Sequence, residues 1–310
     1  MRRRRMVGIA AAATAGILAL TAAVLPSSPP DPTVKLPALT TQALTARYAA
    51  SSRAIARAET AAARSGNASF AHDLAAMRRG HFLAFDAAGQ GEAVQVFGNL
   101  ATARRVVIMV PGSDTSLATW ASRGAASPYG GARALANETA RLDPHAHLAI
   151  IAWLGYRTPS LLSLAALTSG NAGQGAQALR PLVTSLARDG DQVALLCHSY
   201  GSVVCGLAAP HLPVTDIAVY GSPGMDASSV RSLHTTARVW AGRELADWIR
   251  DVPHVRLLGL GFGADPMSPS FGARQFGCGS AGHSGYLSPG GVALRNLAYI
   301  ALGQAGQVTR

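Results

Sequence analysis

Ser199 stands where a short apolar run gives way to a run of small residues. Residues 193–196 are long enough for a buried strand, and residues 202–209 have the composition of a helix built from small residues. A strand, a tight turn and a helix with a serine at the apex form a nucleophile elbow. Gly201 gives the strained apical residue the room it needs, whereas Cys197 occupies the earlier position at which glycine is usual. The pattern predicts that Ser199 is a nucleophile.

The residues of this turn, His198-Ser-Tyr-Gly-Ser202, make the chain resemble the α/β-hydrolase superfamily. More narrowly, it resembles a poorly characterised branch of secreted bacterial serine hydrolases with H-S-Y-G-S at the elbow, and the resemblance covers roughly residues 100–305. It implies an α/β-hydrolase fold, with a mostly parallel sheet, a leading antiparallel hairpin and helices on both faces. It also implies acyl-enzyme chemistry without a metal or an organic cofactor.

A serine hydroxyl is a poor nucleophile until an imidazole accepts its proton. Four histidines follow Ser199 in the chain: His211, His234, His254 and His283. His283 lies in a glycine-rich loop after the last expected strand and before the closing helix, where the superfamily places its base. The resemblance therefore implies that His283 is the base.

The base needs a carboxylate that fixes its tautomer, and the superfamily places that carboxylate between the serine and the histidine. Asp247 follows an expected strand in the usual position of the acid, within Asp-Trp-Ile-Arg, which resembles the acid loop of related lipases and cutinases. Asp265, in Gly-Ala-Asp-Pro-Met-Ser, is the alternative acid, and Asp226, one strand earlier, is a third candidate. Aspartate is also common in turns beside glycine and proline. We expect Asp247 to be the acid.

The loop after the expected strand at residues 106–110 reads Pro-Gly-Ser-Asp-Thr-Ser. In the superfamily this loop donates one of the two backbone N–H groups of the oxyanion hole. By the resemblance, the N–H groups of Ser113 and Tyr200 would hold the oxyanion. The alternative is a turn in which Ser113 or Asp114 caps a helix.

Alternating strands and helices must position these residues. Strands are expected at 81–85, 92–97, 106–110, 147–153, 193–196, 214–220 and 237–241, with a short piece at 256–259, and helices at 132–142, 177–188, 202–209 and 292–302. A turn at residues 89–91 joins the first two strands into a hairpin, and the third is a continuous apolar run. This order predicts one mostly parallel sheet covered on both faces.

Two residues beside Ser199 and one apolar insertion also bear on the expected site. His198 is expected to point to the opposite side of the elbow, as a packed residue and not as the base. Tyr200 is expected to line the site and to pack against residues 157–173. That apolar insertion follows a strand and is a candidate lid or substrate wall, with ordinary core packing as the alternative.

The N-terminal part divides by composition. Residues 1–25 combine Arg2–Arg5 with a charge-free stretch, which predicts a signal peptide or an N-terminal membrane anchor and a secreted or cell-envelope location. Residues 26–38 form a proline-rich linker, and residues 39–80 an N-terminal helical segment that either packs on the core or leads the chain away from a membrane. The hydrolase domain is expected at residues 81–310.

Composition excludes several classes of function. The net charge is +11, but Lys35 is the only lysine among 27 basic residues, and the arginines beyond residue 5 form no basic runs interleaved with aromatic residues. We therefore expect no nucleic-acid partner. The three cysteines, Cys197, Cys205 and Cys278, allow one disulfide and one leftover thiol, and the sequence does not choose the pair.

The predicted function is an exported serine hydrolase that cleaves a carboxylic ester with a lipid or short-chain acyl group. The alternatives are a non-catalytic binding module with the same fold and an acyltransferase that uses the same three residues. The expected partner is a small-molecule ester, membrane association is confined to the N-terminal segment, and a monomer is expected. No G-x-G-x-x-G follows the first strand, so a nucleotide cofactor is not expected.

Overall fold

A computed structural model describes residues 40–121, 124–187, 191–252, 254 and 260–310. Of the two units into which the chain divides, residues 1–32 and 33–310, the second contains all the described residues. The predicted signal or anchor at 1–25, the linker at 26–38 and the short piece expected at 256–259 lie outside the described residues. None of the described helices is both long and apolar enough to span a bilayer.

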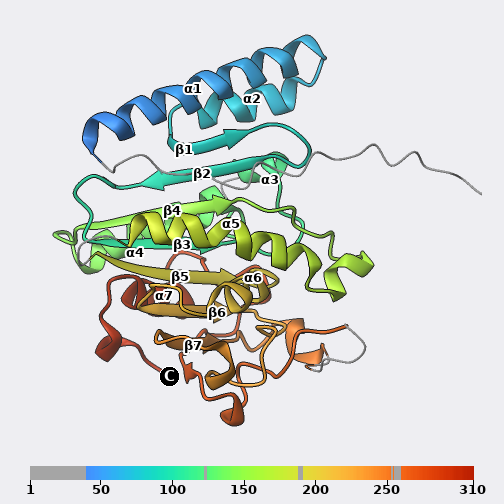
Figure 1. Ribbon diagram of the computed structural model, residues 1–310, viewed down its shortest axis with the longest axis vertical. Coiled ribbons are helices and arrows are strands. Elements are labelled where there is room, and N and C mark those ends of the chain that lie inside the picture. The colour runs from blue at the N-terminus through green and yellow to red at the C-terminus, as the bar shows by residue number, and fades with distance from the viewer. Residues whose placement is uncertain (1–39, 122–123, 188–190, 253, 255–259) are drawn as a thin grey trace, which may run out of the picture. The chain divides into compact units, whose positions relative to one another are not determined.

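One eight-stranded sheet organises the second unit, in the order β1-β2-β4-β3-β5-β6-β7-β8 (Figure 1). β1 pairs antiparallel with β2, β2 pairs antiparallel with β4, and every other neighbouring pair is parallel. The strands are β1 (His81–Asp86), β2 (Glu92–Phe97), β3 (Arg105–Val110), β4 (Leu148–Leu154), β5 (Gln192–His198), β6 (Asp216–Tyr220), β7 (Arg238–Gly242) and β8 (Arg274–Gln275). This confirms the predicted mostly parallel sheet with a leading antiparallel hairpin.

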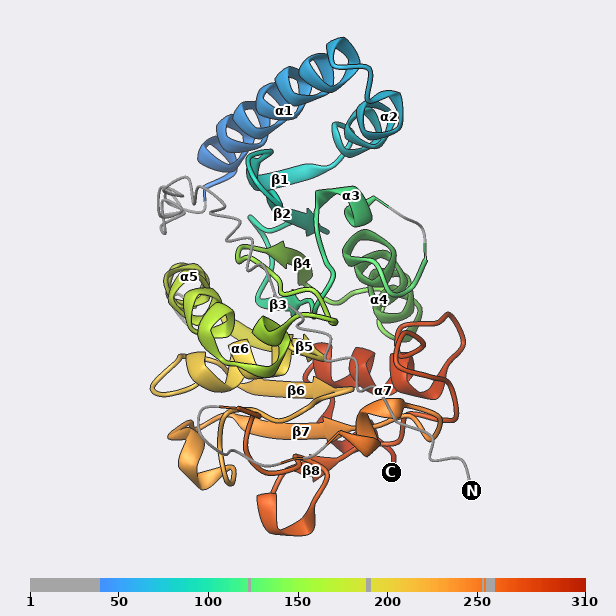
Figure 2. The same ribbon diagram turned by 90° about the vertical axis from the view of Figure 1, so that its right-hand side faces the viewer.

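Helices cover both faces of this sheet. Figure 2 shows α5 (Gly170–Leu186) and α6 (Gly201–Ala208) on one side, and α4 (Pro128–Leu142) and α7 (Val292–Ala301) on the other. The central strands are apolar from Val106 to Val110 and from Val193 to Cys197, because both of their faces are buried there. Along β3, Val106, Ile108 and Val110 pack in the core under α5 and α6, whereas Val107 and Met109 pack in the core under α4 and α7.

Two further helices, α1 (Thr41–Arg64) and α2 (Ala68–Met77), lie beyond β1 at the edge of the sheet (Figure 1). The Arg47 guanidinium donates a hydrogen bond to the Leu83 carbonyl, and Tyr48 stacks on His81 of β1 with ring centroids 4.7 Å apart. Of the two alternatives for residues 39–80, the structure shows the one in which the segment packs on the sheet. The helices cover an edge strand that would otherwise be open to pairing.

The remaining elements are short. They are α3 (Leu117–Trp120) and the 3₁₀ turns η1 (Leu164–Leu167), η2 (Arg231–Leu233), η3 (Trp248–Asp251), η4 (Pro269–Phe271) and η5 (Ala305–Gln307). Because β3 to β8 run parallel, the loops that follow them emerge at one edge of the sheet, the carboxyl edge. Sites in open α/β sheets form at this edge.

Candidate active site

Ser199 occupies a strained turn between β5 and α6. Its φ angle is +52°, in the left-handed region that residues with a side chain rarely adopt. The turn is held on one side by the Ser199 N–H, which donates to the Tyr220 carbonyl at 3.0 Å. On the other side, a Cβ at Gly201 would lie 2.5 Å from the Val110 carbonyl oxygen. Only glycine therefore fits at position 201. The elbow packs directly against the end of β3, and this packing holds the turn that presents the Ser199 hydroxyl.

His283 joins Ser199 to Asp247, although the three residues follow different strands. Its Nε2 lies 2.9 Å from Ser199 Oγ, and its Nδ1 lies 2.9 Å from Asp247 Oδ1 and 3.1 Å from Oδ2. Because the ionised Asp247 carboxylate can only accept a hydrogen bond, the single proton of the neutral imidazole lies on Nδ1. Nε2 is then free to accept the proton of the serine hydroxyl. The arrangement is that of a nucleophile, a base and an orienting acid.

Asp247 is fully buried and still ionises easily. Burial raises its pKa, but hydrogen bonds from His283, Tyr286 and the Ile249 N–H outweigh burial and hold the pKa below its ordinary value. The Tyr286 hydroxyl also accepts a hydrogen bond from the Glu244 N–H at 3.0 Å. The carboxylate is therefore a fixed negative charge directly behind the imidazole.

Two more residues hold the loop that carries His283. The Glu244 carboxylate accepts a hydrogen bond from the Ala281 N–H, and His198 Nε2 lies 2.9 Å from the His283 carbonyl oxygen. Burial, followed by the proximity of His283, lowers the pKa of His198 to about 4. His198 is thus neutral at ordinary pH and carries its proton on Nε2, because a carbonyl can only accept.

The expectation that His198 points to the side of the elbow opposite Ser199 and the site is wrong. Its ring lies 4.9 Å from the His283 ring, centroid to centroid, and it lines the same cavity as Ser199. Side chains alternate along a strand, so Cys197 faces α6 and His198 faces the opposite side, toward Tyr220 and Tyr286. The prediction that His198 is a packed residue and not the base agrees with these contacts.

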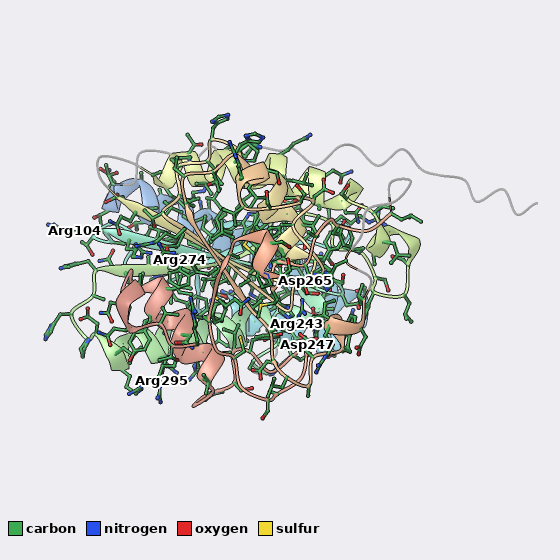
Figure 3. All side chains as sticks on the ribbon, turned by 90° about the horizontal axis from the view of Figure 1, so that it is seen from below. Arg104, Arg243, Asp247, Asp265, Arg274 and Arg295 are labelled. Carbon is green, nitrogen blue, oxygen red and sulfur yellow. A yellow bond between two sulfur atoms is a disulfide. The ribbon has the colours of Figure 1, made fainter. Side chains whose placement is uncertain are left out.

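Asp265, the alternative acid, is placed elsewhere. It pairs with the Arg243 guanidinium, accepts a hydrogen bond from the Met267 N–H at 2.9 Å, and lies 3.8 Å from His254 (Figure 3). Burial raises its pKa, but the hydrogen bond from Arg243 outweighs burial and holds the pKa below its ordinary value. In the part of the chain that the structure describes, Asp265 forms no hydrogen bond or ion pair with His283, whereas Asp247 hydrogen-bonds to it.

The other candidates lie in turns. Asp226, His211 and His234 have positive φ angles of 55°, 57° and 48°. His254 Nδ1 lies 3.0 Å from the Pro223 carbonyl oxygen, and the Asp226 N–H donates to the Phe262 carbonyl. These contacts are typical of residues that shape loops.

The loop after β3 approaches Ser199 closely. A Cβ at Gly112 would lie 2.7 Å from the Ser199 Cβ, so only glycine allows this approach. The Tyr156 hydroxyl donates to the Pro111 carbonyl at 2.7 Å, and the Asp114 N–H donates to the Pro159 carbonyl at 3.0 Å. The loop is fixed by these bonds.

The two expected oxyanion donors lie on either side of this approach. Ser113 follows Gly112 and lines the cavity, and Tyr200 follows Ser199 as the residue before α6. Neither backbone N–H donates a hydrogen bond to another described residue. Both are therefore available to a ligand, and their role as oxyanion donors stays a prediction.

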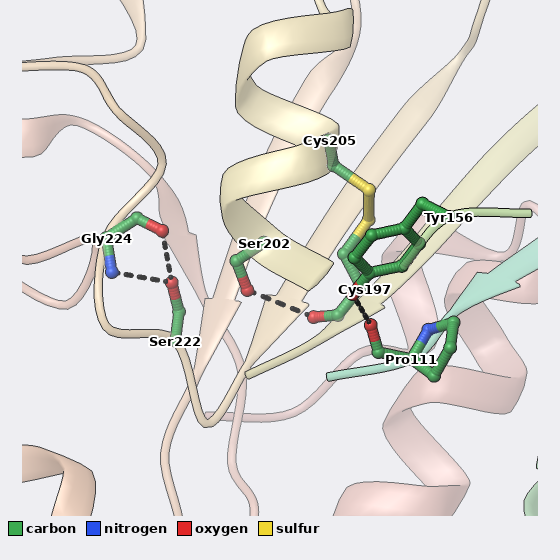
Figure 4. The surroundings of a disulfide bond; sticks show 7 residues. All are labelled: Pro111, Tyr156, Cys197, Ser202, Cys205, Ser222 and Gly224. Carbon is green, nitrogen blue, oxygen red and sulfur yellow. Dashed lines mark hydrogen bonds between the residues drawn. A yellow bond between two sulfur atoms is a disulfide. The ribbon is translucent and has the colours of Figure 1, made fainter. Parts of the chain in front are cut away.

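Figure 4 shows a disulfide between Cys197 of β5 and Cys205 of α6. The Ser202 hydroxyl adds a hydrogen bond to the Cys197 carbonyl at 3.2 Å. Together they join the strand and the helix on either side of Ser199. Cys278 is the leftover thiol and is buried, and burial raises its pKa above the ordinary range.

Ser199 opens into a cavity of about 410 Å³ at the carboxyl edge. Its lining includes Ser113, His198, His283 and Tyr286, and none of the described lining residues is an arginine or a lysine. The Trp248 ring lies 4.6 Å from the His283 ring and forms part of the wall. Among the described residues, no group of three or more His, Cys, Asp or Glu side chains could hold a metal ion.

The insertion at 157–173 adjoins this cavity. Leu161 lines it, and the Leu161 N–H donates to the Asp114 carboxylate. The Tyr200 hydroxyl donates to the Thr168 carbonyl at 2.7 Å and accepts from the Ala172 N–H at 3.2 Å. Tyr200 therefore packs against the insertion as expected, although it does not itself line the cavity.

Sequence reasoning did not identify Tyr286, Trp248 or Glu244 as parts of the site. Trp248 lies directly beside Asp247, so its nearness to the site could have been inferred from the same local sequence. Tyr286 and Glu244 act through contacts between two loops that are about 40 residues apart, and no local pattern reports such contacts.

A comparison with protein-family models matches residues 86–257 to an alpha/beta hydrolase family. An uncharacterized protein of Mycobacterium tuberculosis is 30% identical over 249 residues, which is 69% of this chain and 37% of that protein. The chain thus spans little more than a third of the length of this curated relative.

Solved structures are similar at lower identity. An α/β serine hydrolase without a lid from Xanthomonas campestris is 14% identical, with 73% of this chain and 94% of that chain covered and a TM-score of 0.43. The esterase LipW from Mycobacterium marinum is 14% identical, with 86% and 90% covered and a TM-score of 0.42. The family match covers more than half of the chain and includes the strands from β2 to β7, as well as Ser199 and Asp247. This chain belongs to the alpha/beta hydrolase family.

Proposed function

We propose that this protein is a serine hydrolase that cleaves carboxylic esters through an acyl-enzyme on Ser199. One observation carries the proposal: Ser199, His283 and Asp247 form an unbroken hydrogen-bonded series, and the series starts at a strained elbow that faces a cavity. A buried serine with an ordinary structural role needs neither the strain nor the paired imidazole.

The geometry supports a two-step reaction. Ser199 Oγ attacks the ester carbonyl carbon while His283 Nε2 accepts the hydroxyl proton. The oxyanion that forms is held by the N–H groups of Ser113 and Tyr200, each worth about 3 kcal/mol in the transition state. His283 then gives its proton to the departing alcohol and leaves an acyl group on Ser199.

Water completes the cycle. It attacks the acyl carbonyl while His283 Nε2 accepts one of its protons, and the carboxylic acid leaves as the proton returns to Ser199 Oγ. Asp247 stays ionised throughout and stabilises the imidazolium in both steps. Tyr286 and Ile249 keep that carboxylate in place.

The test is labelling of the purified protein with a fluorophosphonate probe, which reacts only with an activated serine. Native protein should label, and Ser199→Ala should not. Ser113→Ala is the matched control, because Ser113 lines the same cavity but contributes only its backbone N–H. A native protein that folds and does not label, with or without detergent, would contradict the proposal and favour a binding module.

Labelling must be followed by turnover, because an acyltransferase uses the same three residues. Release of free carboxylic acid from an ester in buffer supports hydrolysis. Formation of a new ester in the presence of excess alcohol acceptor, without release of acid, would identify an acyltransferase instead.

Export is the second part of the proposal. Residues 1–25 serve as a signal peptide or an anchor, and residues 26–38 as a linker. The Cys197–Cys205 disulfide supports this, because disulfides persist in oxidising compartments. Cell fractionation of the full chain, compared with a chain that begins at residue 39, tests it. Retention of both proteins in the cytoplasm would contradict export.

A further inference from the structure

We propose that the inner end of the cavity is an acyl-chain pocket and that the enzyme prefers medium-chain acyl esters over acetate esters. The inference rests on the proposed ester hydrolysis and adds the class of acyl group. It follows from the charge of the lining, from the closure of one end of the cavity and from the chemistry of an acyl-enzyme.

The lining offers no counter-ion to a charged acyl group. The chain has 27 basic residues, yet no described lining residue is an arginine or a lysine. Asp114 is the one carboxylate among the described lining residues, and it already accepts the Leu161 N–H. An anionic or cationic acyl group would enter without a partner, which is costly. The pocket therefore suits a neutral, apolar chain.

The cavity lining has a deeply buried apolar part. It contains Met109 of β3, Ala152 of β4 and Leu287, which are only 7%, 1% and 7% exposed. Ala125 belongs to the same part of the lining, because its carbonyl oxygen, Leu287 and Met109 all lie within 4 Å of the position of a Cβ on Gly131. This is the inner end.

The other end of the cavity is open. Leu161 and Trp248 line it and are 46% and 41% exposed. Trp248 also covers His283, which must pass a proton to the departing alcohol. The open end is therefore the path for the alcohol and for the incoming water.

The chemistry decides which part of the ester takes which end. The acyl group stays bonded to Ser199 after the alcohol has left, so it must lie where it blocks neither exit nor entry. Only the closed inner end meets this condition. Each methylene buried there contributes about 0.8 kcal/mol, which corresponds to about fourfold in kcat/KM.

The test is the hydrolysis of p-nitrophenyl esters with acyl chains of two, four, eight and sixteen carbons. For the native protein, we expect kcat/KM to rise by at least about a hundredfold from acetate to octanoate. We expect no further rise for the sixteen-carbon chain, because Met109 and Leu287 close the pocket. A profile that is flat or highest for acetate overturns the inference.

Two variants locate the pocket by changing the acyl-chain preference: one changes the ratio of kcat/KM for octanoate to that for acetate, and the other the ratio for sixteen carbons to that for eight. Ala125→Phe fills the inner end and should lower this ratio by at least tenfold. Leu287→Ala enlarges the pocket and should raise the ratio for sixteen carbons over eight. Ala140→Phe, at an exposed position of α4, is the matched control and should change neither ratio.

Thermal melting of each variant distinguishes a filled pocket from a misfolded protein. The two variants are expected to shift the acyl-chain preference in opposite directions, so either one tests the inference if the other does not fold. An unchanged ratio in a folded Ala125→Phe protein overturns the inference and leaves ester hydrolysis standing. Absence of both turnover and fluorophosphonate labelling in the native protein would instead contradict the proposed function.

Discussion

The Tyr286 hydroxyl donates a hydrogen bond to Oδ2 of Asp247, which makes it a third partner of the carboxylate that faces His283. The same hydroxyl accepts the Glu244 N–H, so it bridges the loop after β7 and the loop before α7. Burial, together with the neighbouring Asp247 carboxylate, raises the Tyr286 pKa above the ordinary range. The phenol therefore stays protonated and remains a donor at neutral pH.

Replacement of Tyr286 by phenylalanine should lower kcat by about tenfold or more and change KM little. A hydrogen bond to a charged group is worth about 1.5–3 kcal/mol, and here it holds the acid behind the base. Steady-state kinetics on an acetate ester measure the effect. Tyr299→Phe, on α7 and outside the cavity lining, is the control. Native kcat in Tyr286→Phe would show that the bridge does not position the acid.

The two candidate acids can be separated by paired substitutions. Asp247→Asn should lower kcat by about 10⁴-fold, as expected when the orienting carboxylate of such a series is lost. Asp265→Asn should leave kcat within a few-fold of native and lower the melting temperature, because Arg243 loses its charged partner. Loss of turnover in Asp265→Asn with retained turnover in Asp247→Asn would reverse the assignment.

Local patterns explain why most of the sheet could be predicted. The apolar run of β3, and the turn at residues 89–91 that precedes β2, each specify a strand without reference to distant residues, and the predicted and observed bounds agree within two residues. The boundary between α1 and α2 shows where this fails. Asn67 follows Gly66 in a pattern typical of a helix stop, but its side chain accepts the Phe70 N–H and caps α2. One residue serves both purposes, and the sequence pattern records only the first.

Helix α5 shows tertiary packing overriding intrinsic propensity. It begins at Gly170, seven residues before the expected start, in a stretch whose glycines suggested a loop. Gly175 is useful there, because a Cβ would lie 3.0 Å from Tyr156 and 3.1 Å from Val204. The close approach of α5 to the sheet and to α6 stabilises a helix that glycine alone would disfavour.

The candidate active site, like the fold, could be predicted only in part from the sequence. The elbow at Ser199 could be predicted because the strand, turn and helix are contiguous. The sequence favoured Asp247 over Asp265 without deciding between them, because both lie in turns after β7 and only the folded loops distinguish a partner in His283 from one in Arg243. The pairing of Cys197 with Cys205 likewise depends on the position of α6 relative to β5 in the folded protein.

A buried ionic cluster at the opposite end of the sheet should make stability depend on acid pH. Asp216 is almost fully buried and pairs with Arg105, Arg238 and the Trp240 indole N–H. Burial raises its pKa, but these hydrogen bonds outweigh burial and hold the pKa below 3.8. The unfolded chain therefore binds a proton near pH 4 and the native protein does not.

The sign of the effect follows from linkage. The stabilisation is complete above about pH 5, where Asp216 is ionised in both states, and it is lost as pH falls through the lowered native pKa. Asp247 and Asp265 contribute in the same direction. Melting temperatures measured between pH 7 and pH 3 should fall most steeply below about pH 4. A melting temperature that is constant down to pH 3 would contradict this prediction.

Asp216→Asn tests the cluster directly. It leaves two arginines near an uncharged amide and should cost about 3–5 kcal/mol of unfolding free energy at pH 7, with a shallower dependence on acid pH than native protein. Glu138→Gln, which removes the surface ion pair with Arg141, is the control and should cost at most about 1 kcal/mol. Equal costs for the two variants would show that burial does not strengthen the Asp216 cluster.

The disulfide across the elbow should contribute measurably to stability. Cys197 and Cys205 are separated by 8 residues, and closure of so short a loop is worth about 2–3 kcal/mol in the unfolded chain. A reductant should therefore lower the melting temperature of the native protein by roughly 4–8 °C. It should have no such effect on the double variant Cys197→Ala/Cys205→Ala. Alanine at 197 keeps a small residue beside the strained Ser199, so the difference reports the cross-link and not the turn.

Cys278→Ala is the matched control for this measurement, because it removes the one thiol outside the bond and should leave the effect of the reductant unchanged. Denatured protein treated with iodoacetamide gives an independent count by intact mass. One label before reduction and three after it are expected from the pairing. Three labels on unreduced protein purified from an oxidising compartment would contradict the bond, and β5 and α6 would then be joined beside Ser199 by packing and the Ser202 hydrogen bond alone.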